Sequence, residues 1–554
     1  MSIRTEPAIR TARGEVRTFL ATATFLWVSA LFLWLPLDSK AAPQGPWKLP
    51  ATTLTPPDSQ ALDPAVAVAA DGTTSVVWQR ISSPSVSVIE VASRPPGGSF
   101  GPPLQVSSPG VYSEHPAIGV APDGSTVVAW VRDNGLLDVV ESASRVPGAV
   151  FFSSPEEISG SSADVEPPFI AAVDSVDVVV WSQFVSGKYV VQQAGRPRNG
   201  SFSAPQDLSI PDQDAKDPQA VIAPDGTTTI AWHRFDGADR IIQERTRPPG
   251  GAFAPANNLS LAGADSEAPR LGVDGDGAVT AAWLRGPSGS GTVQVASRPA
   301  GQQFFGNGVD VSQAGGVSEL SLSVSKSAGE ALAWVRNDVP VSFIIQSSGR
   351  TGTGPFPAPV DLTPSGQQAI SPSVVTAPDG TVTVAWAGPA GIRSATRTAT
   401  GSFGPVTTLS GGGFATDPKL AVDSEGRVTA AWEEGQLPDE SIEAASTTVD
   451  TTVHRARIGK VGISGPKKAR KGRKVTFKVR IVNSGNAVAN GVNLKVTGRG
   501  VRAAAKVGKI AAGKSKTVRV RFRPRKPGKI RLTFRISSGN AGGKAVKRAI
   551  RVGK

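Results

Sequence analysis

Residues 44–450 repeat one pattern of apolar and polar positions. Each unit starts with a short apolar run behind a proline, as in residues 116–121, and then passes through a tight turn that is usually Asp-Gly. A second apolar run ends on tryptophan and a third ends on arginine. A fourth places an aliphatic residue six positions after an aromatic one, as in Phe202 and Leu208. Short apolar runs bounded by Gly and Pro turns predict four short strands per unit.

Tryptophan fixes the period of this repeat. Successive repeat tryptophans lie 46 to 52 residues apart, and most intervals are 51. Four strands in a unit of this length are typical of a propeller blade, and a lone blade cannot bury both of its faces, so the blades must stack around an axis. A large ring at the same place in every unit is expected to serve packing rather than sugar binding. The repeat tryptophans are Trp78, Trp130, Trp181, Trp232, Trp283, Trp334, Trp386 and Trp432.

The two ends of the repeat region complement each other. The eighth unit has a third strand near residues 442–446 but no fourth, whereas residues 47–55 resemble the fourth strand at 403–410. If the first strand completes the last blade, the ring closes and exposes no sheet edge. We therefore predict an all-β fold in which residues 44–450 form an eight-bladed β-propeller closed by its N-terminal strand. Units three and six lack the Asp-Gly turn and are expected to be degenerate blades.

The C-terminal region follows a different pattern. From about residue 453, apolar and basic residues alternate strictly, as in residues 474–481, which predicts half-buried antiparallel strands. Residues 453–554 are therefore expected to form a β-sandwich. Within them, residues 482–487 followed by 492–496 resemble bacterial immunoglobulin-like domains of the adhesion-related kind. That resemblance implies an Ig-like sandwich.

The charge of the chain divides at the same place. Residues 451–554 contain 31 Lys and Arg and no Asp or Glu, whereas residues 43–450 contain 23 Lys and Arg against 42 Asp and Glu. Cations repel one another across a sheet, and a polyanion would relieve that repulsion. An anionic envelope polymer or glycan fits better than nucleic acid, because the domain has no Trp or Tyr to stack on bases. The alternative is that the charge only keeps the surface soluble. The candidate polyanion contacts are Lys474, Lys478, Arg480, Arg519, Arg521, Arg523, Lys529, Arg531 and Arg535.

The N-terminus has the pattern of a secretory signal. Four arginines at positions 4, 10, 13 and 17 precede an uncharged run over residues 19–37, and Ser39-Lys40-Ala41 places small residues at a cleavage site after Ala41. The alternative to a signal peptide over 1–41 is an uncleaved membrane anchor. Both interpretations place the rest of the chain outside the cytoplasm, secreted or at the cell surface.

No residue pattern points to a catalytic, cofactor-binding or metal-binding site. The chain has no cysteine, which excludes disulfides and thiol chemistry. His115, His233 and His454 lack the spacing of zinc ligands, and residues 274–277 hold only a fragment of a calcium loop. Residues 97–101 match the G-x-S-x-G elbow but form an ordinary repeat turn. Because the turn aspartates and strand-end arginines recur from unit to unit, we expect them to pair with each other as a structural device.

The Asp-Gly turn followed by tryptophan loosely resembles the Asp-box of sialidases and other bacterial propellers. That box places Asp five residues before Trp, whereas Asp225 stands seven before Trp232. The resemblance implies a propeller fold. It does not extend to sialidase activity, because the chain has only two tyrosines, Tyr112 and Tyr189, and lacks the entry motif.

These patterns predict an exported, monomeric binding, adhesion or scaffold protein of the cell envelope rather than an enzyme. The sandwich would attach to anionic polymers, and the propeller would present a face to a glycan or a protein. Membrane contact is expected only through an uncut N-terminal segment. The alternative is a divergent glycoside hydrolase or lyase. Non-repeating carboxylates converging at one end of the axis would favour the enzyme, and small residues such as Ala67 and Gly119 along the axis would favour a scaffold. A third hypothesis is that the basic domain docks on the acidic propeller and masks it.

Overall fold

The computed structural model describes residues 46–554 except 57–58, 161–163, 174, 199, 288–289, 328, 339–341, 353, 437, 449–456, 485–488, 512, 539–540 and 542. All regular structure among these residues is β-strand, so the chain is all-β as predicted. This part of the chain accordingly holds no helix of the length and apolar character that a membrane span requires. The expected signal segment, residues 1–41, and His454 lie outside the described residues.

The repeat region forms eight antiparallel sheets of four strands within the described residues, which is the form of propeller blades. In sheets one to seven the strands are paired in sequence order, and the fourth strand is only two residues long. Sheets one to four comprise β2 (Gln60–Val68), β3 (Thr74–Ser83), β4 (Val86–Arg94) and β5 (Leu104–Gln105); β6 (Ser113–Val120), β7 (Thr126–Asp133), β8 (Asp138–Arg145) and β9 (Glu156–Glu157); β10 (Phe169–Ala172), β11 (Val176–Val185), β12 (Lys188–Pro197) and β13 (Gln206–Asp207); β14 (Ala215–Ile222), β15 (Thr228–Phe235), β16 (Arg240–Arg247) and β17 (Asn257–Asn258). Sheets five to seven comprise β18 (Ser266–Val273), β19 (Val279–Arg285), β20 (Thr292–Arg298) and β21 (Val309–Asp310); β22 (Gly316–Ser325), β23 (Gly329–Asp338), β24 (Ser342–Arg350) and β25 (Val360–Asp361); β26 (Ile370–Thr376), β27 (Val382–Gly388), β28 (Gly391–Arg397) and β29 (Thr407–Thr408).

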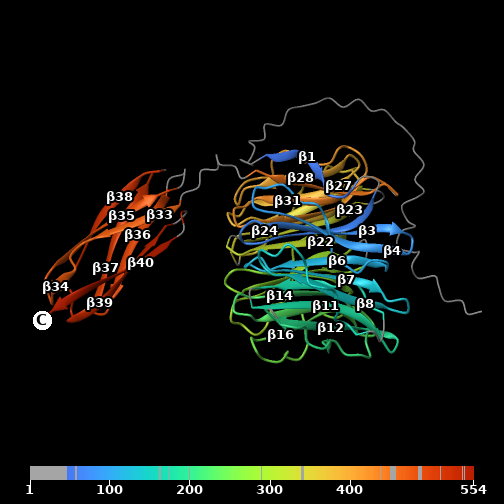
Figure 1. Ribbon diagram of the computed structural model, residues 1–554, viewed down its shortest axis with the longest axis horizontal. Coiled ribbons are helices and arrows are strands. Elements are labelled where there is room, and N and C mark those ends of the chain that lie inside the picture. Colours follow the sequence, from blue (N-terminus) through green and yellow to red (C-terminus); the bar gives the residue numbers. More distant parts are fainter. Residues whose placement is uncertain are drawn as a thin grey trace, which may run out of the picture. The chain divides into compact units, whose positions relative to one another are not determined.

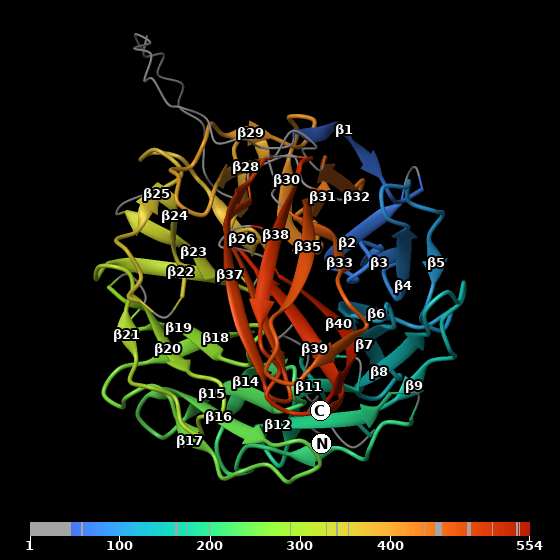
Figure 2. The ribbon, with the colours of Figure 1, turned by 90° about the vertical axis from the view of Figure 1, so that its left-hand side faces the viewer.

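Sheet eight draws its strands from both ends of the repeat region. It consists of β30 (Ala415–Val422), β31 (Val428–Glu434), β32 (Ser441–Thr447) and β1 (Trp47–Thr53). β1 runs antiparallel to β32, with Trp47 opposite Thr447. The predicted fourth strand of the eighth unit is therefore supplied by the N-terminal segment. Figure 2 shows the eight sheets following one another in sequence order around a common centre, and Figure 1 shows the same stack from another side.

Each repeat tryptophan fills the space between its own sheet and the preceding one. Trp130 packs with Val77 and Ile89 of sheet one, and Trp78 packs with Ile442 of sheet eight. All eight tryptophans are fully buried. Burial of a large ring stabilises the fold by roughly 2–3 kcal/mol, and a fully buried ring offers no platform to a sugar.

Opposite the tryptophan, the first strand of seven sheets contains a bulge. In sheet one, Leu62 pairs with Gln79 and Ala65 with Val77, so two residues are left to face Trp78. The first residue of each bulge has a φ between 51° and 55°, in the left-handed region, where Asp and His are more common than most residues. These bulge residues are Asp63, His115, Asp217, Ala268, Glu319, Ser371 and Asp417.

The first strands of neighbouring sheets lie very close together. A Cβ at Gly119 would stand 2.5 Å from Ile170 Cγ2 of sheet three, and one at Gly272 would stand 2.3 Å from Val324 Cγ2 of sheet six. Serine side chains also cap the neighbouring backbone, because Ser321 Oγ accepts a hydrogen bond from Val374 N at 3.2 Å. The glycines are therefore required by close packing near the axis.

The C-terminal region is a two-layered sandwich. One sheet contains β33 (Ile458–Ser464), β35 (Val475–Asn483) and β38 (Ser515–Phe522), and the other contains β34 (Lys468–Arg470), β40 (Lys544–Gly553), β39 (Gly528–Ser537), β36 (Ala489–Gly498) and β37 (Val501–Ile510). The alternating apolar residues of both sheets form one core. At its centre the Phe477 ring lies 5.8 Å from Phe522 and 5.5 Å from Phe534.

Candidate functional site

The third-strand arginines join neighbouring sheets. Arg94 Nη2 donates to Thr429 Oγ1 at 2.8 Å and to Ser446 Oγ at 2.6 Å, both in sheet eight. The Arg94 guanidinium also lies 4.9 Å from the centre of the Phe100 ring of its own sheet. Equivalent bonds to hydroxyls of the preceding sheet are made by Arg145, Arg196, Arg298 and Arg350. These hydrogen bonds give the arginines a structural role between neighbouring sheets.

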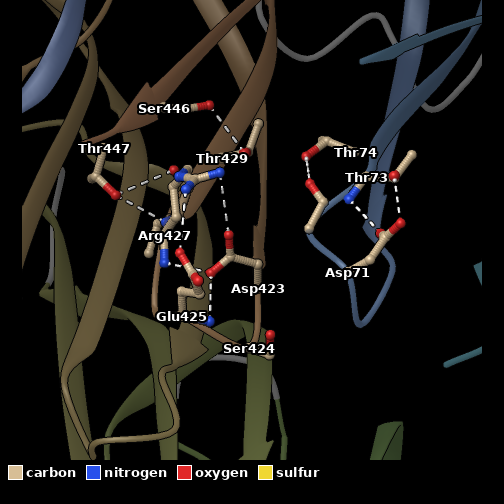
Figure 3. A network of polar contacts seen from close by, with 12 residues as sticks. Asp71, Thr73, Thr74, Asp423, Ser424, Glu425, Arg427, Thr429, Ser446 and Thr447 are labelled. Carbon is tan, nitrogen blue, oxygen red and sulfur yellow. Dashed lines mark hydrogen bonds and ion pairs between the residues drawn. The ribbon is translucent and has the colours of Figure 1, made fainter. Parts of the chain in front are cut away.

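Several turn aspartates bind their own backbone, and the expected pairing of turn aspartates with arginines is found in only some units. Asp71 Oδ1 accepts a hydrogen bond from Thr73 N at 2.8 Å, and Asp423 Oδ1 accepts one from Arg427 N at 2.8 Å (Figure 3). An aspartate reaches the N–H two residues ahead more easily than a distant guanidinium. Asp–Arg pairs form between Asp123 Oδ2 and Arg198 Nε at 3.7 Å, between Asp177 Oδ2 and Arg196 Nε at 2.9 Å, and between Asp423 Oδ2 and Arg427 Nη1 at 3.5 Å.

The bulges bring charged residues of neighbouring sheets together beside the first strands. Asp63 Oδ2 lies 3.0 Å from His115 Nδ1 of sheet two, and Asp63 N donates to Glu433 Oε1 of sheet eight at 2.7 Å. Lys419 Nζ lies 2.5 Å from Asp417 Oδ1, and Ser371 N of sheet seven donates to Glu319 Oε2 of sheet six. We call Asp63, His115, Glu319, Asp417, Lys419 and Glu433 the bulge cluster.

Glu433 is the most perturbed member of the bulge cluster. Its side chain is almost completely enclosed, with the residue 8% exposed. The pKa of Glu433 is raised to about 7, chiefly by burial and also by the negative charges of Asp417 and Asp63, against the opposing effect of the hydrogen bond from Asp63 N. Burial likewise raises the pKa of Glu319. The cluster therefore contains a carboxyl group that exchanges its proton near neutral pH.

At the bulge of sheet four, a histidine lies beside the bulge aspartate. His233 Nδ1 lies 3.2 Å from Asp217 Oδ2 and lowers the pKa of Asp217. Arg270 Nε donates to the Leu320 carbonyl of the next sheet at 3.1 Å. The structure thus has both kinds of residue that we expected to discriminate between the functional hypotheses: small residues such as Gly119 on the first strands, and two non-repeating carboxylates, Glu319 and Glu433, near the bulges.

The predicted polyanion contacts are all exposed, but the structure divides them between two faces. Along each strand these basic side chains alternate with apolar side chains that point into the shared core. The outer faces of the two sheets therefore point in opposite directions. The three-stranded sheet and its strand ends carry Lys474, Lys478, Arg480, Arg519, Arg521 and Arg523, and the five-stranded sheet carries Lys529, Arg531 and Arg535. We call these the three-stranded and five-stranded cationic faces.

Like charges stand directly opposite each other on both faces. Lys478 pairs with Arg519 across β35 and β38, and Lys529 pairs with Arg551 across β39 and β40. Such pairs are unfavourable by a few tenths of a kcal/mol to about 1 kcal/mol each. Because residues 451–554 contain no Asp or Glu, no side chain of the domain can neutralise them.

Sequence reasoning missed several of these residues. Arg551 and Lys495 extend the five-stranded cationic face, with Lys495 opposite Arg535, and their place in an alternating basic strand was the signal available. For the bulge cluster, the signal was the residue before the repeat proline, which changes from Asp63 to His115. For Glu433, the available signal in the sequence was its position directly after a repeat tryptophan.

Comparisons with known proteins identify the sandwich. Residues 457–541 match the CARDB family, so the chain has a CARDB Ig-like domain at its C-terminus, and β40 lies beyond the matched range. No curated protein matches the chain. Among the described residues, no group of three His, Asp or Glu side chains could hold a metal ion.

Several solved structures are similar to parts of the chain. A protein of unknown function from Dyadobacter fermentans is 11% identical over 72% of this chain and 96% of its own, with a TM-score of 0.40. An ulvan lyase of a new polysaccharide lyase family is 10% identical over 65% of this chain and 96% of its own, with a TM-score of 0.43. The CARDB domain of a Pyrococcus furiosus protein, solved in complex with di-metal ions, is 16% identical over 18% of this chain and 96% of its own, with a TM-score of 0.16. At this level of similarity neither a site nor an activity transfers to this chain.

Proposed function

We propose that the protein is an exported binding protein of the cell envelope and that its CARDB domain attaches to an anionic polymer. One observation carries this proposal: both outer faces of the sandwich present Lys and Arg side chains in directly opposed pairs, such as Lys478 with Arg519, with no carboxylate side chain in the domain. A linear polyanion would neutralise several such pairs at once. The charged N-terminal pattern supports export.

In this proposal the eight four-stranded sheets are the blades of one closed eight-bladed propeller. The pairing of Trp47 with Thr447 and the packing of Trp78 on sheet eight support the closure. The propeller supplies a second binding surface, for a glycan or a protein, and the protein acts as a monomer. The three-stranded cationic face is the stronger candidate for the polymer, because it gathers six of the nine predicted contacts.

The proposal is tested by the salt concentration that releases the full-length protein from immobilised dextran sulfate or polygalacturonate. Neutralising the three-stranded cationic face with Lys478→Gln, Arg480→Gln, Arg519→Gln and Arg521→Gln should lower that concentration sharply, because exposed ionic contacts are screened by salt. The control is Lys48→Gln with Lys326→Gln, two exposed lysines of the repeat region. Elution of both variants at the wild-type salt concentration would contradict the proposal.

The bulge cluster favours a second function, cleavage of a glycan. A general base or acid works best with a pKa near the operating pH, and Glu433 has such a pKa. Because Glu433 is enclosed, the more exposed His115 and Asp63 would contact the substrate and pass the proton. This function is tested by incubating the protein with acidic and neutral polysaccharides and measuring new reducing ends. Activity that Glu433→Gln leaves unchanged would rule out this site.

A further inference from the structure

Sheet six departs from the repeat at the two positions that receive the arginine of the next sheet. One position stands three residues before the tryptophan, and the other stands one residue before the arginine that ends the third strand. In most sheets at least one of these two positions carries a hydroxyl. Sheet four has Thr229 and Thr246, which accept bonds from Arg298 at 2.6 and 2.5 Å. Sheet six has Ala331 and Gly349 instead. Arg397 of sheet seven therefore finds no acceptor hydroxyl at these two positions of sheet six.

Arg397 is poorly satisfied as a result. Its hydrogen bonds within the described residues are two long ones of 3.4 Å, from Nη1 to the carbonyls of Thr398 and Ala399. Its guanidinium lies 5.6 Å from the Phe403 ring, whereas the other arginines that end a third strand lie 4.4 to 5.0 Å from the equivalent ring. Every other arginine that ends a third strand in the described part of the chain donates to a side-chain acceptor.

Arg247 shows that the missing hydroxyls alone do not explain why Arg397 lacks a side-chain acceptor. Sheet three also lacks them, since it has Val178 and Gly195 at these positions. Arg247 nevertheless donates to Thr228 Oγ1 of its own sheet at 3.5 Å. The position in sheet seven that corresponds to Thr228 is Val382, which has no hydroxyl.

A cavity of about 250 Å³ lies where the arginine bridge is missing, between sheets six and seven. Its lining includes Arg397, Arg350, Glu330 and Thr376. Glu330 is 7% exposed and Thr376 is 4% exposed. Their atoms Glu330 Oε2 and Thr376 Oγ1 have no hydrogen-bond partner among the described residues. Arg350 is fully engaged, with Nε 2.5 Å from Glu330 Oε1 and Nη2 2.7 Å from Ser297 Oγ. The cavity-lining groups with unused hydrogen-bonding capacity are therefore those of Arg397, Glu330 and Thr376.

The three open groups define the chemistry of a ligand. Burial lowers the pKa of Arg397, but a guanidinium stays charged at neutral pH, so a partly desolvated cation faces the cavity. It requires an anionic oxygen. Glu330 Oε2 accepts hydrogen bonds only and requires a hydroxyl or N–H donor, and the Thr376 hydroxyl can serve either kind of partner. A simple anion such as acetate cannot satisfy Glu330.

We propose that the cavity between sheets six and seven binds a hydroxylated organic anion, of the size of one acidic sugar unit. Its carboxylate or sulfate accepts hydrogen bonds from Arg397, one hydroxyl donates to Glu330 Oε2, and another bonds to Thr376 Oγ1. This site lies in the repeat region and does not depend on the cationic faces of the sandwich. It goes beyond the proposed polymer attachment.

The experiment measures the thermal unfolding midpoint of the full-length protein with sodium glucuronate, glucose 6-sulfate or glucose at constant ionic strength. A ligand that binds only the folded state raises the midpoint. We expect a rise of a few degrees with one or both of the acidic sugars and none with glucose, and the two acids distinguish a carboxylate from a sulfate site. Lys478→Gln with Arg519→Gln, on the three-stranded cationic face, should leave the rise unchanged.

Two variants locate the effect. Arg397→Gln should abolish the rise, because it removes the cation. Ala331→Ser restores a hydroxyl that Ser75 supplies in sheet one, gives Arg397 an internal partner, and should reduce the rise even if Arg397→Gln unfolds the protein. The proposal is overturned if no acidic sugar raises the midpoint, if glucose raises it equally, or if Ala331→Ser and every folded Arg397 variant keep the full rise.

Discussion

Arg94 Nη2 donates a hydrogen bond of 2.6 Å to Ser446 Oγ, although the two residues are 352 positions apart in the sequence. The bond connects the first four-stranded sheet to the last. The bond from Asp63 N to Glu433 Oε1 connects the same two sheets near the axis. The chain therefore uses polar contacts as well as the packing of Trp78 where its two ends meet.

The Arg94 bridge should contribute measurably to stability. Arg94→Met removes two hydrogen bonds from a charged donor and the contact with Phe100, and we expect it to lower the free energy of unfolding by about 2 to 3 kcal/mol. The matched control is Arg397→Met, which loses no bond to a side chain and should cost clearly less. Urea denaturation measures both variants, and equal losses would show that the hydroxyl bridge contributes nothing.

Glu433 should make stability fall as the pH rises. Its pKa is about 7 in the folded protein against 4.5 as the ordinary value, so the folded state holds the proton more tightly than the unfolded chain does. The stability linked to this group is complete below pH 4.5 and is lost as the pH rises through 7. Glu433→Gln should remove this dependence and stabilise the protein at pH 8 by on the order of 2 kcal/mol. Unfolding measured from pH 5 to 8 tests this, with the exposed Asp212→Asn as the control.

A methyl group at Gly119 should be costly. Its Cβ would stand 2.5 Å from Ile170 Cγ2, so the first strands of sheets two and three would have to separate. Overpacking of this kind costs about 1 to 3 kcal/mol. Gly315→Ala, at a position with nothing within 4 Å of the new Cβ, should change stability little. Similar melting temperatures for the two variants would contradict the close packing.

The repeat tryptophans should differ in how well they tolerate phenylalanine. Trp130 Nε1 donates to Glu141 Oε2 at 3.2 Å, whereas Trp283 Nε1 has no partner among the described residues. Trp130→Phe should therefore cost about 1 to 2 kcal/mol more than Trp283→Phe, because it leaves a buried carboxylate oxygen without its donor. Chemical denaturation of the pair provides the comparison, and a larger loss for Trp283→Phe would contradict the assignment.

The architecture was predictable because it depends on local, repeated signals. Tryptophan spacing and Asp-Gly turns predicted the four-stranded units, and the strict alternation after residue 453 predicted a sandwich whose cations are exposed. The fourth strands were placed correctly but are only two residues long, as in β13. The aromatic residue that precedes them, such as Phe202, instead supports the arginine bridge, with Arg196 4.6 Å from its ring.

The contacts between units were harder to predict. The partners of Arg94 lie in another sheet, and neither Thr429 nor Ser446 stands at a fixed, short distance from it in the sequence. The pairing of arginines with turn aspartates was therefore confirmed in only some units, because the prediction considered charge alone. The cavity beside Arg397 is lined by Gly349, and the lack of a hydroxyl at Ala331 and Gly349 matters only because Arg397 of the next sheet faces these positions.

The central claim, attachment to an anionic envelope polymer through the CARDB domain, is tested most directly by co-sedimentation of the full-length protein with isolated bacterial cell envelopes at low and high salt. We expect wild-type protein to sediment at low salt and to be released at high salt, because the contacts are ionic and exposed. The variant neutralised at Lys478, Arg480, Arg519 and Arg521 should stay in the supernatant at both salt concentrations. Sedimentation of that variant to the wild-type extent, or wild-type binding that salt does not weaken, would contradict the account.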